Sequence, residues 1–135
     1  VDISLNQTDI PHNIEIAESN LDDRISLDDN SLDIVTSMAI IEHLNHPEQY
    51  LKEVHRILKP NGTFVMTVPS VYAKPVLEFL AYKLGVISKE EILDHKRYYD
   101  RTKLREALMQ AGFLEKNIHH SYFQLGMNNF VIATI

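Results

Sequence analysis

The side chains best suited to acid–base chemistry near neutral pH in this chain are its seven histidines. They are spread along the sequence, and none has the paired helical spacing of a zinc site. Glu42, His43 and His46 lie near one another, but further ligands do not accompany them. No serine stands in a nucleophile-elbow pattern, and no phosphate-binding loop of the kinase or NTPase type occurs. The residues therefore fit proton transfer or substrate orientation better than metal or serine chemistry.

The clearest elements that could position such residues are a strand, a helix and a second strand. The nearly continuous apolar run 32–41 predicts a buried strand. Pro47 fits a first helical position, and an apolar stripe at helical spacing follows it until residues 59–62, Lys-Pro-Asn-Gly, end the helix. The β-branched and aromatic run 63–68 predicts the next strand. Two parallel strands need such a crossover, so the unit predicts a parallel sheet.

Weaker patterns predict the remaining elements. They comprise short strands at 1–4 and 14–17, an acidic loop at 20–31, helices at 74–84 and 103–111, and strands at 117–125 and 129–135. The last two strands are joined through Gly126-Met127-Asn128, which predicts an antiparallel hairpin. The order indicates a three-layer, Rossmann-like α/β fold with a mostly parallel sheet. Ligands bind at the carboxyl ends of such strands, so we expect the site after Ile3, Ala17, Ser37 and Val68.

Composition narrows the classes of function. The chain has 135 residues, 44% of them apolar and 24% charged, which is typical of one globular domain. A formal charge of −6 argues against a nucleic-acid partner. No apolar run is long enough to cross a bilayer and no signal-peptide pattern is present, so we expect a cytoplasmic protein without membrane insertion. The absence of cysteine excludes disulfides and thiolate metal ligands.

The sequence of residues 32–70 resembles that of a known protein family. Two stretches closely resemble the second half of the class I S-adenosylmethionine-dependent methyltransferases. They are Leu-Asp-Ile-Val-Thr-Ser-Met-Ala-Ile-Ile-Glu-His-Leu and, later, Ile-Leu-Lys-Pro-Asn-Gly-Thr-Phe-Val-Met-Thr-Val-Pro-Ser. The resemblance implies S-adenosylmethionine as cofactor and S-adenosylhomocysteine as product. It also implies methyl transfer to a small-molecule acceptor, which we expect to receive the group on oxygen.

The resemblance implies two sets of residues that contact the nucleoside part of the cofactor. Asp2 and Ile3 resemble the end of the family's second strand, where a carboxylate accepts hydrogen bonds from both ribose hydroxyls. Asn20 and Leu21 resemble the loop after the third strand, which lies against the adenine. On residue type alone, Asp2 is equally a polar residue near a chain end, and the loop equally an ordinary acidic turn.

The resemblance places further residues around the transferred methyl group. Ser37, Met38 and Ala39 resemble the segment after the fourth strand, which lines the methionine part of the cofactor and the methyl-transfer channel. His43 follows this segment and His95 lies in a loop that resembles the family's acceptor cover, so both are candidate general bases. A structural contact is the alternative for His43, and a solvated surface for the residues around His95.

The chain also departs from the family. The glycine-rich turn after the first strand is absent, together with that strand and the following helix. We therefore expect residues 1–135 to form a single partial methyltransferase domain with a helical insert at about 71–101. A non-catalytic Rossmann-like partner or scaffold module remains an alternative. Another chain of a homo-oligomer could complete the sheet.

Overall fold

The computed structural model describes residues 19–76 and 97–135 of the chain. Its elements are β1 (Leu32–Met38), α1 (Pro47–Ile57), β2 (Leu58–Pro69), α4 (Arg101–Ala111), the short 3₁₀ helix η2 (Glu115–Asn117), β3 (Ile118–Phe123) and β4 (Asn128–Thr134). The expected strands at 1–4 and 14–17, and most of the expected helix at 74–84, lie outside the described residues.

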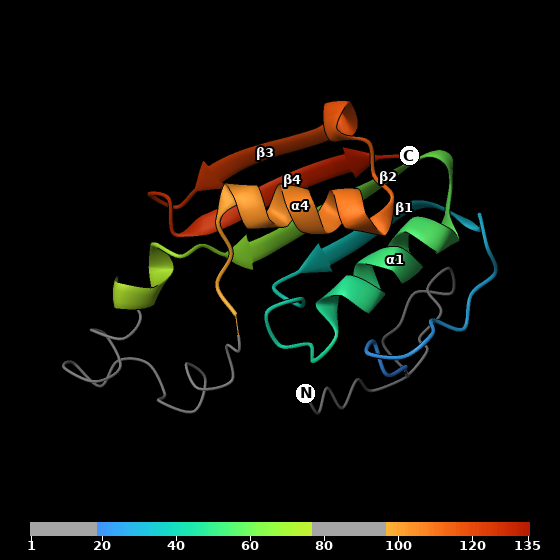
Figure 1. Ribbon diagram of the computed structural model, residues 1–135, viewed down its shortest axis with the longest axis horizontal. Coiled ribbons are helices and arrows are strands. Elements are labelled where there is room, and N and C mark those ends of the chain that lie inside the picture. The colour runs from blue at the N-terminus through green and yellow to red at the C-terminus, as the bar shows by residue number, and fades with distance from the viewer. Residues whose placement is uncertain (1–18, 77–96) are drawn as a thin grey trace, which may run out of the picture.

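The four described strands form one mixed sheet in the order β1-β2-β4-β3. β1 and β2 are parallel, whereas β4 is antiparallel to both β2 and β3. This arrangement confirms the α/β class and the C-terminal antiparallel hairpin. Figure 1 shows α1 and α4 side by side on one face of the sheet, with their N-terminal ends near the carboxyl ends of β1 and β2.

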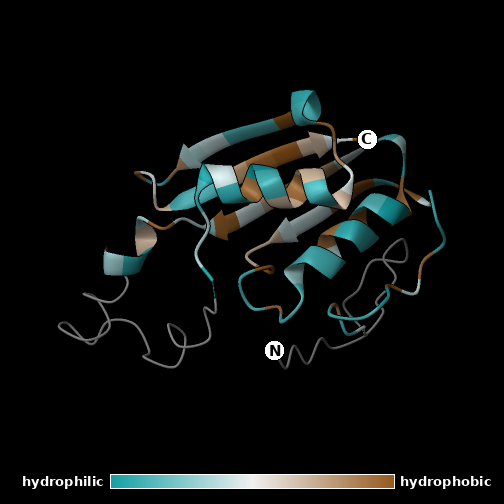
Figure 2. Cartoon of the chain, in the orientation of Figure 1, coloured by the Kyte–Doolittle hydropathy of each residue, from teal (hydrophilic) through white to brown (hydrophobic). Residues whose placement is uncertain are grey.

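The core lies between this helix pair and the sheet. Apolar side chains of α1 and α4 meet the alternate residues of β2 and β4 that face them. Figure 2 shows the hydrophobic colour of β4 and of the end of β2, whereas the outer face of α1 is largely hydrophilic. The fully buried members include Leu51, Val54, Phe64, Met66, Leu104, Leu108 and Val131. Burial of these side chains fixes both helices over the sheet.

β2 is longer than its composition predicts. The expected strand begins at Thr63, whereas β2 begins at Leu58, which pairs with Leu32 of β1. The register then shifts, and regular pairing resumes where Ile34 meets Thr63. The turn-forming residues 59–62 are thus an irregularity within a strand rather than a connection before it.

α4 begins at Arg101, two residues before the expected start, because Asp100 caps it. The Asp100 carboxylate accepts a hydrogen bond from the Lys103 amide at 2.8 Å. The helix ends at Gly112, as expected, in the left-handed region with φ of +116°. The bridge between Tyr99 and Ser70 places the N-terminal end of α4 beside the loop that follows β2.

Candidate functional site

The carboxyl ends of the parallel strands β1 and β2 form the candidate site. The chain leaves β1 through Ala39, which has a left-handed φ of +53°. The Ala39 amide donates to the Thr67 carbonyl at 3.0 Å and lies 3.2 Å from the Thr67 hydroxyl. That hydroxyl donates in turn to the Met38 sulfur at 3.6 Å. The last residues of β1 are therefore held tightly against β2.

Residues 37–39 form a wall at the carboxyl end of β1, and their contact with the methionine part of the cofactor stays a prediction. Ser37 and Ala39 are small, so a ligand can approach their backbone closely, and Met38 is 47% exposed and apolar. Ser37 is buried, with its hydroxyl beside the Tyr50 phenol. Burial raises the pKa of Tyr50, and the Ser37 hydroxyl partly offsets that rise. The non-glycine left-handed turn at Ala39 is the kind of backbone strain that concentrates at functional sites.

The acidic loop 20–31 is anchored beside this wall by Asp22. Its carboxylate accepts hydrogen bonds from the His46 amide at 2.7 Å, the Asn45 amide at 3.2 Å and the Asn45 side chain at 2.8 Å. The His46 amide is the main cause that lowers the pKa of Asp22. Because Asp22 and Asn45 are 23 residues apart, sequence reasoning missed this link. The loop is thereby joined to the segment that follows β1.

Asn20 and Leu21 are placed in this loop with different surroundings. The Asn20 side chain donates to the Asp23 carboxylate at 2.7 Å and accepts from the Asp22 amide at 3.2 Å, within its own exposed turn. Leu21 packs against the core. Their contact with adenine stays a prediction. Asp2, Ile3 and His95 lie outside the described residues.

Arg56 holds the other end of the same loop. Its guanidinium donates to the Glu53 carboxylate at 2.7 Å, to Asp29 at 2.6 Å and to the carbonyls of Ile25 and Leu27 at 2.8 Å each. The Ile25 amide also donates to Glu53 at 3.0 Å. The Arg56 guanidinium lowers the pKa of the Glu53 carboxyl. The loop is therefore held at one end by the segment that precedes α1 and at the other end by α1 itself.

His43 lies in the segment between β1 and α1, next to the fully buried Glu42. Its ring is half-buried, with Nδ1 shielded from solvent, and its amide donates to the Ile40 carbonyl at 3.0 Å. This position is compatible with both a catalytic and a structural role, so the role as base stays a prediction. Within residues 19–76 and 97–135, no group of three His, Asp or Glu side chains is arranged to hold a metal ion.

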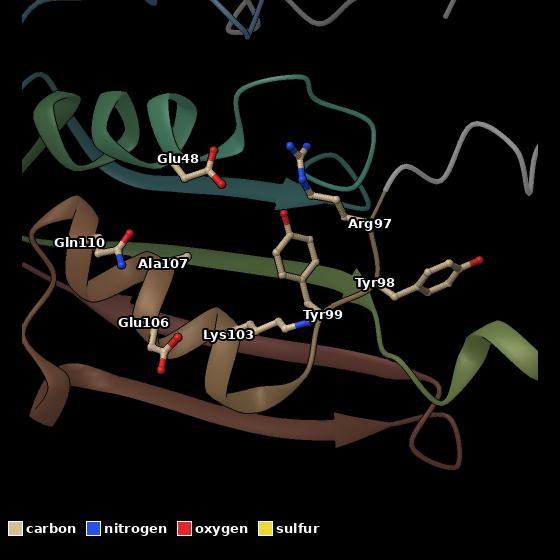
Figure 3. A pocket seen from close by; sticks show the side chains of 8 residues that line it. All are labelled: Glu48, Arg97, Tyr98, Tyr99, Lys103, Glu106, Ala107 and Gln110. Atoms are coloured by element: carbon tan, nitrogen blue, oxygen red, sulfur yellow. The ribbon is translucent and has the colours of Figure 1, made fainter.

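A pocket of about 350 Å³ opens between α1 and α4. It is lined by Glu48, Arg97, Tyr98, Tyr99, Lys103, Glu106, Ala107 and Gln110. Figure 3 shows the Tyr99 ring between the two helices, with its hydroxyl directed toward Glu48 and Arg97. Burial raises the pKa of Tyr99 to about 12. Arg97 donates to the carbonyls of Leu44 at 2.7 Å and Asn45 at 3.2 Å, so it joins the pocket to the loop after β1.

Comparisons with known proteins agree with this architecture. A family model described as "Methyltransferase domain" matches residues 1–66. A protein of Mycolicibacterium smegmatis named "Probable S-adenosylmethionine-dependent methyltransferase" is 35% identical over 102 residues, which cover 74% of this chain and 35% of that protein. The ubiquinone/menaquinone biosynthesis C-methyltransferase UbiE of Neisseria meningitidis is 26% identical over 112 residues, covering 73% and 46% respectively.

The fold is also found among solved structures. A SAM-dependent methyltransferase from Aquifex aeolicus superposes with a TM-score of 0.63 at 18% identity, covering 92% of this chain and 56% of that one. The chain spans between a third and a half of the length of the two curated relatives above. Within the described residues, no helix is both long enough and apolar enough to cross a bilayer. Over residues 1–66 the chain therefore matches the methyltransferase domain family, and the fold of its described residues is shared with S-adenosylmethionine-dependent methyltransferases.

Proposed function

We propose that the protein containing this chain transfers the methyl group of S-adenosylmethionine to an oxygen atom of a small-molecule acceptor. The observation that carries the proposal is the anchored, left-handed exit of β1 at Ala39, at the edge of the sheet where ligands of parallel α/β folds bind. The names of the curated relatives support the cofactor and the type of reaction.

In this proposal the chain binds and orients rather than supplying a reactive group of its own. The cofactor, when bound, provides a methyl group on a positively charged sulfur that reacts without a metal. Ser37, Met38 and Ala39 contact its methionine part, and the hydrogen bonds of Thr67 keep this wall in one position. A fixed wall matters because positioning two reactants contributes much of the rate enhancement in a displacement reaction.

The nucleoside part of the cofactor is assigned to the residues that the family resemblance indicates. Asp2 and Ile3 would contact the ribose, and Asn20 and Leu21 the adenine. The links from Asp22 to Asn45 and His46 support the second pair, since they join the loop of Asn20 to the segment after β1.

An oxygen acceptor must lose a proton as it is methylated, and we assign this task to His95 or His43. The position of His43 in the segment between β1 and α1 supports its inclusion. Carbon is the competing acceptor atom, because one of the relatives is named a C-methyltransferase.

Titration calorimetry of the full-length protein with S-adenosylhomocysteine tests the cofactor assignment. We expect micromolar binding, weakened several-fold by Met38→Ala because an apolar contact is lost. Ile34→Ala is the matched control, since Ile34 lies on the same face of β1, four residues before Met38. A folded protein that does not bind S-adenosylhomocysteine would contradict the proposal and favour a non-catalytic module.

The acceptor atom requires a separate measurement. The protein is incubated with S-adenosylmethionine carrying a ¹³C-labelled methyl group and a small-molecule extract, and the product methyl is observed by NMR. A methoxy resonance supports the oxygen assignment. A methyl resonance on carbon overturns that assignment and leaves methyl transfer intact.

A further inference from the structure

A buried amide on β4 fixes the protonation pattern of a histidine on β3. Asn129 is 0% exposed. Its Nδ2 donates to the carbonyls of Val68 at 3.2 Å and Tyr99 at 3.1 Å, and its Oδ1 lies 2.8 Å from His120 Nε2. The opposite orientation of the amide would place its oxygen against two carbonyl oxygens, which rules that orientation out. His120 Nε2 must therefore carry the proton that Asn129 Oδ1 accepts.

This hydrogen bond defines what the rest of the imidazole can do. A neutral histidine that donates through Nε2 presents Nδ1 as a hydrogen-bond acceptor. The His120 ring is half-buried and lies on the same face of the sheet as Asn129, the face that carries the helices. The protein thus holds an oriented acceptor on β3, and the Asn129 side chain links it to Val68 near the carboxyl end of β2.

Two exposed tyrosines form a continuous surface with this histidine. We call this surface the aromatic corner (Tyr72, His120 and Tyr122). The His120 and Tyr122 rings meet edge to face at 4.7 Å and 83°, and the Tyr122 and Tyr72 rings at 5.8 Å and 69°. Tyr72 is 58% exposed and Tyr122 is 40% exposed. Adjacent exposed aromatic rings beside a polar group are typical of a ligand surface.

The corner is firmly attached to the candidate site. The buried Ser70 directly follows β2, and its hydroxyl donates to the Gly126 carbonyl at 2.5 Å while accepting from the Tyr72 amide at 3.1 Å. The Ser70 amide donates to the Met127 carbonyl at 2.8 Å. Tyr72 is therefore tied both to the end of β2 and to the β3–β4 turn, so the rings from separate segments keep their mutual arrangement.

We infer that the aromatic corner binds a planar, hydroxylated aromatic ring, whose edge packs on Tyr72 and Tyr122 and whose O–H donates to His120 Nδ1. The inference rests on the proposed function, because it makes this ring part of the methyl acceptor. In the order β1-β2-β4-β3, β3 lies three strand spacings from β1, or about 14 Å. The ring at the corner is therefore remote from the methyl-accepting atom, and the corner determines acceptor affinity rather than the rate of transfer.

NMR of the imidazole nitrogens in the full-length protein tests the contact directly. The probe is 4-methylphenol, and 4-methylanisole, which lacks the O–H, is the control compound. We expect 4-methylphenol to shift the His120 Nδ1 resonance and to leave His119 unchanged, because His119 lies on the opposite face of β3. An unshifted His120 resonance, or an equal shift with 4-methylanisole, would overturn the inference.

A pair of variants separates the aromatic contact from a general effect on the strand. Tyr122→Ala should weaken 4-methylphenol binding roughly 3- to 10-fold, the effect of one aromatic pair. Phe123→Ala, on the opposite face of the same strand, should leave it unchanged. Equal effects of the two variants would contradict the inference. S-adenosylhomocysteine binding to the native protein separates the two proposals. A native protein that does not bind S-adenosylhomocysteine contradicts the proposed function, whereas a native protein that binds it but not 4-methylphenol contradicts only the aromatic corner.

Discussion

Replacing Gly112 with alanine should destabilise the domain through two separable costs. Gly112 ends α4 with φ of +116°, and its amide donates to the carbonyls of Leu108 and Met109. A Cβ at this position would lie 2.8 Å from Nε2 of His55 and 3.0 Å from two further ring atoms. The His55 ring packs edge to face on Phe113 at 5.1 Å and 84°, so it cannot move aside without losing that contact.

The magnitude follows from adding the two costs. A left-handed backbone costs an L-residue about 1–2 kcal/mol. Displacing His55 from its preferred rotamer costs about 0.5–1.5 kcal/mol more. We expect Gly112→Ala to lower the free energy of unfolding by about 1.5–3.5 kcal/mol. Gly126→Ala is the matched control, because Gly126 has φ of +85° but no heavy atom within 4 Å of the added Cβ.

Urea unfolding followed by far-UV circular dichroism measures both variants. Gly126→Ala should show only the backbone cost, about 1–2 kcal/mol. In a double-mutant cycle, His55→Ala should recover about 0.5–1.5 kcal/mol of the loss in Gly112→Ala. Equal destabilisation by the two glycine substitutions, or no coupling between residues 55 and 112, would refute the steric part of this reasoning.

Two further predictions concern the loop anchor and the helix cap. The pKa of Glu53 is lowered in the folded state, so its ion pair with Arg56 stabilises the protein above the ordinary glutamate pKa of 4.5 and is lost as the pH falls through the lower folded value. The stability difference between the native protein and Glu53→Gln should therefore shrink on acidification from neutral pH, as measured by urea unfolding, and a pH-independent difference would contradict this. Asp100→Ala should cost about 1 kcal/mol by removing the cap of α4. Asp100→Asn should retain most of that stability in thermal unfolding, and equal losses in the two variants would exclude capping as the cause.

Local patterns were sufficient to predict the elements that need few distant partners. The apolar stripe after Pro47 predicted α1, and the run 63–68 predicted the central part of β2, because burial of one face imposes the helical or strand period on the sequence. Gly112 marked the end of α4 for a similarly local reason, since the left-handed cap follows from the geometry of one turn. The family resemblance of the residues at the end of β1 predicted a site at this strand end, which is where the structure has the anchored turn of Ala39.

Contacts between distant residues were decided only by the tertiary structure. The start of β2 at Leu58 depends on its pairing with Leu32, and the loop anchors Asp22 and Arg56 find partners more than 20 residues away. Sequence composition cannot rank such pairings, because many residues of the same type compete for them.

The neighbouring histidines on β3 show most clearly the difference between what the sequence predicts and what the tertiary structure decides. His119 and His120 are equivalent in type, and the sequence by itself determined only that they lie in a strand of the C-terminal hairpin. The register of β3 against β4 turns His120 toward the buried Asn129 and His119 to the opposite face. Side chains alternate across a strand, so a shift of one residue would exchange the two, and only the packed sheet fixes that register.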